Sequence, residues 1–231
     1  MRKNIVVALD LGSSKLSVAV GQLNQDSTIS VLALNQIDTA GIRRGNVVDI
    51  ESLVGAIDEL LDGVERISGI QISSAMLGFS GTSTATTINR ATIAVANPNH
   101  AITGEDIERA IQAARMIPIS PDRSVVHVIP RQFTVDGFEG VVDPLGMMGS
   151  RLEVEVIIVS AMTSALQNLI RTVSRSGTKV KAIAINSIMA AEAVLSSAEK
   201  EMGVALIDIG GGTSEVAIFD QGALAFASVL P

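Results

Sequence analysis

Short apolar runs separated by polar turns fill the first eighty residues and predict a β-rich opening. The runs have the length and β-branched composition of strands. Between the third and fourth runs, apolar positions recur every three or four residues from Leu53 to Val64, which is the spacing of a helix face, and Asp49 precedes them as an N-cap. The pattern therefore predicts a layered β-β-β-α-β unit. The four predicted strands are residues 4–10, 15–21, 28–35 and 72–79.

The pattern changes after the fourth strand. A hydroxyl-rich segment follows, and Thr103 with Asp106 has the spacing of a capping box before a helix. Residues 152–159 begin with strand alternation and end fully apolar, as expected for a strand that becomes buried along its length. We therefore predict that residues 81–157 form a small α+β insert and that the surrounding fold resumes near Ile158. Other predicted strands are 124–129, 132–135, 180–185, 203–209, 216–219 and 223–229.

Two helices are predicted between the insert and the end of the chain. The first is capped by Thr163 and ends at Gly177, a residue type common after helix C-termini. The second opens at Ser187 and runs through Leu195 to Ala198.

One motif occurs twice. Each copy is an apolar run, an Asp, a Gly-centred turn with hydroxyl residues, and a second apolar run, which predicts a β-hairpin with a polar tip. Glycine allows backbone N–H groups to approach an anion closely, and the Asp is placed to hold a cation through water. The alternative is an ordinary hairpin whose Asp and Ser satisfy the turn. The copies are Asp10-Leu-Gly12-Ser13-Ser14-Lys15 and Asp208-Ile-Gly210-Gly211-Gly212-Thr213.

Two copies of the motif favour a site that clamps a magnesium-bound polyphosphate. We expect both turns to face one cleft, with the backbone at Gly12 and at Gly211 separated by about 10 Å, the size of a polyphosphate. The predicted phosphate-binding residues are Gly12, Ser13, Ser14, Lys15, Gly210, Gly211, Gly212 and Thr213. Asp10 and Asp208 are predicted to hold Mg²⁺ through water molecules rather than by direct contact.

Composition narrows the class of protein. The 231 residues are 47% hydrophobic but only 2% aromatic, so the core must be aliphatic, which suits packed α/β layers. The absence of cysteine excludes disulfides and thiolate metal sites. A net charge of −7 makes nonspecific nucleic-acid binding unfavourable, and no nucleic-acid partner is predicted. His100 and His127 have no ligand-spaced partners, so we expect them to be solvated or locally hydrogen-bonded rather than bound to zinc.

The paired motifs resemble the phosphate 1 and phosphate 2 segments of the actin-like ATPases. Over essentially its whole length the chain more specifically resembles the N-terminal portion of the FtsA family of bacterial cell-division proteins. The supporting segments include Gly45-Asn-Val-Val-Asp49, Phe79-Ser-Gly81, Val126-His127-Val-Ile-Pro130 and Asp143-Pro-Leu-Gly146. The resemblance implies an α/β fold, an actin-like (ribonuclease H-like) lobe with an inserted α+β subdomain and a second lobe that is truncated in this sequence.

The resemblance also implies a division into subdomains. Residues 1–80 and 158–200 would form subdomain 1A, residues 81–157 the inserted subdomain 1C of the SHS2 type, and residues 201–231 the start of subdomain 2A. ATP and Mg²⁺ would bind between the lobes, with Lys15 pairing with the β- and γ-phosphates as a point charge.

In function, the resemblance implies a protein that binds ATP, self-associates through residues 81–157 and links the FtsZ ring to the membrane and to later division proteins. Such a protein is cytoplasmic and works at the inner face of the membrane at the division site. Its membrane anchor is a C-terminal helix that this sequence lacks. Chaperone-type relatives place Glu-Pro where this chain has Asn186-Ser187. Because Asn cannot act as a base, we expect at most weak ATPase activity.

Three alternatives stay open. The chain could be a type IV pilus adaptor of the PilM kind, which shares the fold. It could be an assembly module that works without nucleotide, or a kinase or phosphatase of the same superfamily. The segment at residues 126–130 favours the division family, and Asn186 in place of an acid counts against an efficient enzyme.

Overall fold

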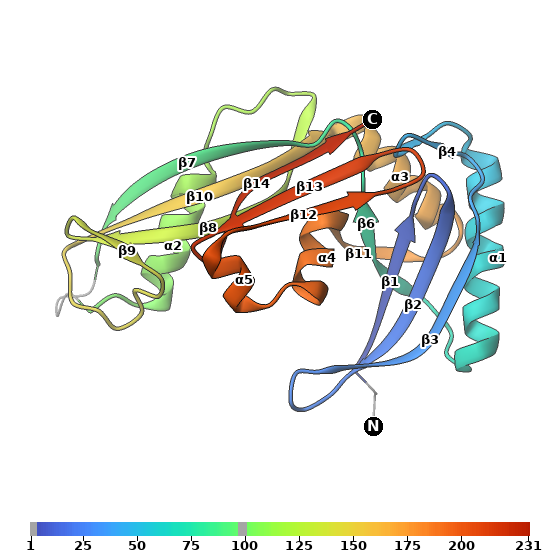
Figure 1. The fold of residues 1–231 in the computed structure, drawn as a ribbon, viewed down its shortest axis with the longest axis horizontal. Coiled ribbons are helices and arrows are strands. Elements are labelled where there is room, and N and C mark those ends of the chain that lie inside the picture. The colour runs from blue at the N-terminus through green and yellow to red at the C-terminus, as the bar shows by residue number, and fades with distance from the viewer. Residues whose placement is uncertain (1–3, 97–100) are drawn as a thin grey trace.

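A computed structural model describes residues 4–96 and 101–231 of the chain (Figure 1). His100 lies outside the described residues. The first structural unit is a five-stranded sheet in the order β11-β6-β1-β2-β3. β1, β2 and β3 form an antiparallel meander, whereas β6 runs parallel to both β1 and β11. The strands are β1 (Ile5–Leu11), β2 (Lys15–Leu23), β3 (Ile29–Asp38), β6 (Ser74–Phe79) and β11 (Lys179–Ile185).

Two helices in contact with each other pack on this sheet, α1 (Ile50–Ser68) beside β2 and β3, and α3 (Thr163–Arg175) beside β11. Asp49 caps α1 as predicted, because its carboxylate accepts a hydrogen bond from the Ser52 N–H at 3.1 Å. The apolar stripe of α1 is buried against the sheet. Thr163, predicted as a cap, is instead the first residue of α3, and Met162 takes the N-cap position. A two-stranded hairpin, β4 (Ile42–Arg43) and β5 (Asn46–Val47), precedes α1.

The predicted insert contains a second, fully antiparallel sheet in the order β7-β10-β8-β9. Helix α2 (Gly104–Arg115) packs on it and begins at the predicted Thr103–Asp106 capping box. The side chains between helix and sheet form a hydrophobic core separate from that of the first sheet. The strands are β7 (Ala85–Ala94), β8 (Arg123–Val135), β9 (Phe138–Val141) and β10 (Arg151–Met162).

Strand β10 contributes side chains to both cores. Val156 and Ile158 belong to the core under α2, whereas Ile157 and Val159 belong to the core of the first sheet. Successive residues of a strand point to opposite faces, so one strand can serve two cores when both faces are covered. The boundary expected between residues 157 and 158 therefore falls inside β10, which continues to Met162.

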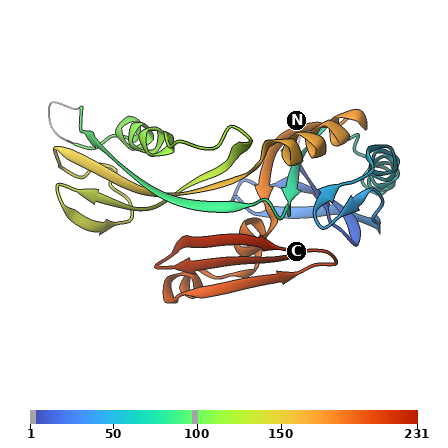
Figure 2. The same ribbon diagram turned by 90° about the horizontal axis from the view of Figure 1, so that it is seen from above.

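A third sheet follows the first two and forms a separate layer that lies along β7 and β10 (Figure 2). It is an antiparallel meander of β12 (Val204–Ile209), β13 (Ser214–Asp220) and β14 (Ala223–Leu230), and its inner face joins the core of the first sheet. The single helix expected from Ser187 to Ala198 is two helices, α4 (Asn186–Val194) and α5 (Ser197–Met202), because Ser196 forms a new capping box with Glu199. In the described part of the chain, no helix is long and apolar enough to cross a membrane.

Candidate functional site

The two copies of the repeated motif are the tips of two hairpins, β1–β2 and β12–β13. We call residues 12–15 the first glycine turn and residues 210–213 the second glycine turn. Both turns are closed by the same backbone hydrogen bond. The Gly12 N–H donates to the Lys15 carbonyl at 3.1 Å, and the Gly210 N–H donates to the Thr213 carbonyl at 2.9 Å. The sequence repeat is therefore also a repeat of backbone conformation.

The tips of the two hairpins touch each other. A Cβ atom added to Gly211 would lie 2.5 Å from the Cβ of Ser14, and one added to Gly212 would lie 2.7 Å from the Cβ of Ser13. The turns thus face one region and touch at Gly211–Ser14 and Gly212–Ser13, whereas the separation expected between Gly12 and Gly211 stays a prediction. The contact is possible because neither glycine has a side chain to hold the backbones apart.

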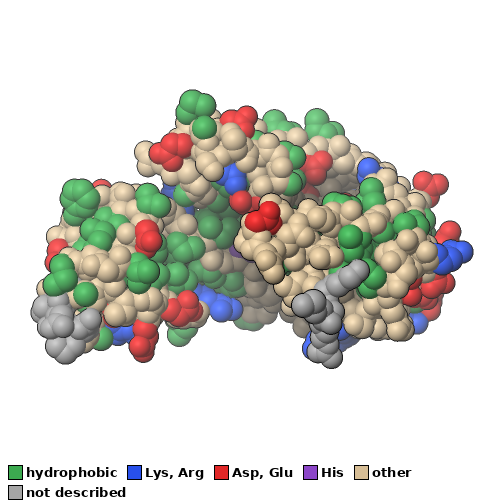
Figure 3. Space-filling model, turned by 90° about the horizontal axis from the view of Figure 1, so that it is seen from below, with side chains coloured by type: hydrophobic (Ala, Val, Ile, Leu, Met, Phe, Trp, Pro, Cys, Tyr) green, Lys and Arg blue, Asp and Glu red, His purple; other side chains and the backbone are tan. Residues whose placement is uncertain are grey.

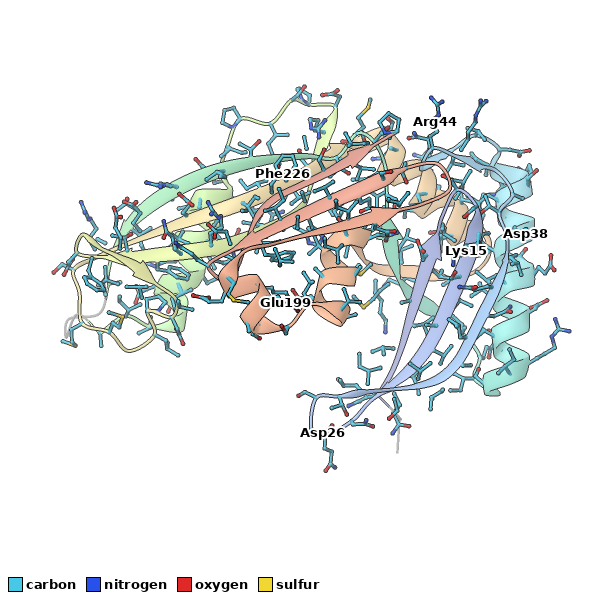
Figure 4. The ribbon with its side chains drawn as sticks, viewed as in Figure 1. Lys15, Asp26, Asp38, Arg44, Glu199 and Phe226 are labelled. Carbon is cyan, nitrogen blue, oxygen red and sulfur yellow. The ribbon has the colours of Figure 1, made fainter. Side chains whose placement is uncertain are left out.

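A cavity of about 430 Å³ lies at this contact, which is within the usual size range of small-molecule sites. All of the residues predicted to bind phosphate or magnesium line it, except Gly212, which packs against Ser13 and the backbone of Arg44. Figure 4 shows Lys15 and Arg44 at the end of the first sheet, near the tip of the β12–β13 hairpin. The cavity is also lined by four residues that the sequence did not single out as ligand-binding, namely Gly45, Ser80, Ile209 and Glu215, and by Asn186.

Asp10 belongs to a hydrogen-bonded group on the wall of the cavity. The Asn186 side-chain amide donates to the Asp10 carboxylate at 2.8 Å and to the Ser80 hydroxyl at 2.7 Å. Burial raises the pKa of Asp10, while the hydrogen bond from Asn186 lowers it. The negative charge of Asp208 raises it further, and the charge of Lys15 opposes this effect. A cation between the two aspartates would relieve their repulsion.

Glu215 is a buried acid of the site that the sequence analysis missed. It is only 2% exposed, and its carboxylate accepts hydrogen bonds from the Ser80 hydroxyl and, at 2.9 Å, from the Ser187 N–H. Glu215 therefore ties the β12–β13 hairpin to the end of β6 and to the start of α4. The sequence did contain a signal. Glu215, Ala217 and Phe219 are alternate residues of β13, so their side chains point to the same buried face of the strand.

The first glycine turn is held in place from outside the motif. The Gly45 N–H donates to the Ser13 hydroxyl at 2.9 Å, and the Thr39 hydroxyl donates to the Gly12 carbonyl at 2.7 Å. Gly45 has a φ of +68°, and an added Cβ would lie 2.2 Å from the Ser80 carbonyl oxygen. Within the described residues Lys15 forms no ion pair, so its ammonium group is available to a ligand.

Replacing Glu215 with glutamine should change how stability depends on pH. Burial raises the pKa of Glu215 above its ordinary value of 4.5. The folded protein then holds this proton more tightly than the unfolded chain. The resulting stabilisation is complete below pH 4.5 and is lost as the pH rises through the folded pKa. In urea denaturation from about pH 4 to about pH 7, wild type should lose stability relative to Glu215→Gln.

A matched control for this experiment is Glu51→Gln. Arg175 hydrogen-bonds to Glu51 and lowers its pKa, so Glu51 stabilises the fold above its ordinary pKa and this effect is lost as the pH falls. The difference between wild type and this variant should be small, because Glu51 is exposed, and should have the opposite slope. A pH-independent difference for Glu215→Gln would contradict the assignment of a raised pKa.

Comparisons with known proteins identify the family. The family model described as the SHS2 domain inserted in FtsA matches residues 81–160. The chain is 36% identical over 231 residues to the cell division protein FtsA of Borreliella burgdorferi, covering all of this chain and 56% of that protein. It is 36% identical over 227 residues to FtsA of Bacillus subtilis, covering 98% of this chain and 51% of that protein. The chain thus spans about half the length of the curated relatives it matches.

Solved structures establish the fold. A chain of a PilM–PilN type IV pilus biogenesis complex superposes with a TM-score of 0.66 at 16% identity, covering 97% of this chain and 61% of the other. The ethanolamine utilization protein EutJ from Carboxydothermus hydrogenoformans gives a TM-score of 0.54 at 13% identity. The match covers 100% of this chain and 53% of the EutJ chain. Together with the sequence matches, they show that this chain has the actin-like ATPase fold with an inserted SHS2 domain and belongs to the FtsA family of cell-division proteins.

Proposed function

We propose that the chain binds Mg-ATP in the cavity beside the two glycine turns. The observation that carries the proposal is the convergence of two hairpin tips with the same turn on one cavity that also holds Asp10, Lys15 and Asp208. The glycine N–H groups and the serine hydroxyls can donate to phosphate oxygens. Lys15 supplies a positive charge for the β- and γ-phosphates.

The residues around the cavity also fit a hydrated magnesium ion. Within residues 4–96 and 101–231 no cluster of three or more acidic or histidine side chains could hold a metal by itself. Mg²⁺ commonly keeps several waters and binds through one or two carboxylates and the phosphates of a nucleotide. Asp10 and Asp208 are suited to this role, because both line the cavity and their charges repel each other.

We infer that ATP turnover by this site is weak. Asn186 stands at the step between β11 and α4 and cannot accept a proton from an attacking water. The carboxylate of Glu215 lies in the same cavity, but both of its oxygens already accept hydrogen bonds, from Ser80 and from the Ser187 N–H. The geometry therefore favours a nucleotide that is held and sensed over one that is rapidly hydrolysed. For the same reason a kinase or phosphatase function is not favoured.

We propose that the whole protein, of which this chain is a part, is an adaptor that binds ATP and self-assembles. It would link the FtsZ ring to the membrane and to later division proteins. The adaptor would act at the inner face of the cell membrane at the division site. We assign residues 1–80 and 158–200 to subdomain 1A, 81–157 to 1C and 201–231 to the start of 2A. The pilus alternative is less favoured, since identity is 16% to the PilM–PilN chain but 36% to FtsA relatives.

We assign self-association to residues 81–157. This segment has a core of its own, and its outer loops and short hairpin expose large apolar side chains. Among them are Phe138, Val142 and Met148. Exposed apolar side chains of this kind are typical of surfaces that bind another protein.

Replacing Asp208 with asparagine should weaken Mg-ATP binding by about 10- to 100-fold, the equivalent of one interaction with a charged group. Asparagine has the same shape as aspartate but no negative charge, so it cannot attract the hydrated Mg²⁺ ion. The measurement is a titration of the 231-residue protein with a fluorescent ATP analogue, with and without Mg²⁺. Asp220→Asn, at the opposite end of β13 from the second glycine turn, is the matched control and should bind normally. A wild-type protein that binds no nucleotide would refute the proposal.

A further inference from the structure

A hydrogen bond from the first sheet to a histidine of the insert links the two parts, in addition to the packing of β10 in both cores. His127 lies on β8, and its Nε2 accepts a hydrogen bond from the backbone N–H of Ile185 at 3.1 Å. Ile185 is the last residue of β11, an edge strand of the first sheet, and it is fully buried. Viewed from below, the molecule is hollowed between the insert and the first sheet (Figure 3). The hydrogen bond that the Ile185 backbone donates to the His127 side chain is one of the contacts that hold the insert against the first sheet.

The residue that follows Ile185 is Asn186, which contacts the nucleotide cavity. Its amide group donates to Asp10 and to Ser80, and its Oδ1 is buried without a hydrogen-bond partner among the described residues. The amide packs against the bare backbone of Gly78, where an added Cβ would lie 2.1 Å from Oδ1. The amide is held only by the two hydrogen bonds that its nitrogen donates, so a shift of the backbone at residues 185 and 186 would act directly on those two bonds.

We propose that His127 is a positioning residue that couples the insert to the nucleotide cavity through Ile185 and Asn186. The proposal rests on the proposed nucleotide function. A protein partner that shifts β8 when it binds the insert would move the backbone at Ile185, and with it the amide that holds Asp10. By thermodynamic linkage, the occupant of the cavity would change the affinity of the insert for that partner by the same factor. The chain of contacts is short and continuous, because His127 bonds to Ile185 and the next residue, Asn186, bonds to Asp10.

The coupling requires His127 to be neutral. Because Nε2 accepts a hydrogen bond, the single ring proton must be on Nδ1. A second proton would turn Nε2 into a donor facing another donor, and the bond to Ile185 would be lost. Burial lowers the pKa of His127, so the ring is neutral at physiological pH. The elements packed against β8 are β9, β10, β11, β14 and α2. Burial alone causes the shift, and no charged residue of these elements or of β8 itself contributes to it. Those charged residues are Arg123, Arg131, Glu139, Arg151, Glu153, Glu155, Lys179, Lys181, Glu105, Asp106, Glu108, Arg109 and Arg115.

Two substitutions test the proposal. His127→Leu fills similar space but cannot accept a hydrogen bond, whereas His127→Gln keeps an acceptor oxygen. In NMR spectra without nucleotide, the leucine variant should shift the signals of the Ile185 amide and of the Asn186 side-chain amide, and the glutamine variant should largely restore them. Mg-ATP affinity should fall about five-fold in the leucine variant, the effect of one neutral hydrogen bond, and recover with glutamine.

Wild-type protein supplies a second measurement that does not depend on the folding of a variant. On acidification, the Ile185 and Asn186 signals should titrate with the same midpoint as the His127 ring. Asp10 and Glu215 also titrate in this network, and because His127→Gln retains both, the histidine contribution is the difference between the two proteins. Unchanged Asn186 signals in a folded leucine variant, or signals that ignore the His127 midpoint, would overturn the coupling.

The two readouts separate this inference from the proposed function. If the Asn186 signals respond to His127 but no protein binds ATP, the coupling stands and the nucleotide function fails. If ATP binds equally to all variants and the signals do not move, the nucleotide function stands and the coupling fails.

Discussion

Replacing Gly211 with alanine should weaken Mg-ATP binding by about 100-fold, because the new methyl group would push the two glycine turns apart. Its carbon would lie 2.5 Å from the Cβ of Ser14, whereas non-bonded carbons prefer about 3.5–4.0 Å. The Ser14 Cβ is attached directly to the backbone and cannot rotate away, so one turn must shift. Losing two hydrogen bonds to charged phosphate oxygens, at about 1.5 kcal/mol each, corresponds to the stated factor.

The matched control is Gly55→Ala in the middle of α1. A Cβ at Gly55 meets no atom within 4 Å, so the substitution should leave nucleotide affinity unchanged. It should stabilise the helix by up to about 1 kcal/mol, the difference in helix propensity between the two residues. Affinity is measured with a fluorescent ATP analogue, and thermal unfolding shows that each variant is folded. Normal affinity in Gly211→Ala would mean that the contact between the turns does not shape the site.

Replacing Phe79 with alanine should lower the free energy of unfolding by about 3–5 kcal/mol, as expected for removing a buried aromatic ring. Phe79 is 2% exposed at the end of β6, and its ring lies against Gly81, where an added Cβ would be 2.2 Å from a ring carbon. The ring therefore supports the backbone on both sides of Ser80. We expect the cavity left by the ring to persist, because the β6 backbone is held between β1 and β11.

Urea denaturation measures this effect, with Phe138→Ala as the control. Phe138 is 71% exposed on β9, so its removal should change the free energy of unfolding by no more than about 0.5 kcal/mol. A loss below about 1 kcal/mol for Phe79→Ala would show that the surrounding side chains close the space completely.

Local sequence patterns predicted much of the fold, because they report local physics. The stripe of α1 and its Asp49 cap, the Thr103–Asp106 capping box and the first three strands all follow from the spacing of apolar and capping residues. The pattern failed where two signals overlap. It divided β8 at Pro130, whereas the strand continues and accommodates the proline at a bulge in its pairing with β10. It also ran α4 and α5 together.

The candidate site could be predicted in its parts but not in its assembly. Asp10, Lys15 and the glycines came from a motif, and the motif carries its own chemistry. The contact between the two turns, the bonds of Asn186 and the burial of Glu215 depend on segments more than a hundred residues apart in the chain. Contacts between segments so far apart cannot be predicted from local patterns in a single sequence. The burial of Glu215 could have been predicted, because it alternates along β13 with Ala217 and Phe219, whose side chains face the core.

The double role of β10 has a consequence for cooperativity. A grafted module joined by a flexible tether can unfold while its host stays intact, but β10 carries alternate side chains into two cores along one rigid strand. If either core opens, one face of β10 loses its packing. The other core is then destabilised as well, because it contains the side chains of the opposite face of β10. The insert and the first sheet should consequently melt as one foldon, and amide protons along β10 should exchange at the rate of global unfolding rather than through a local opening.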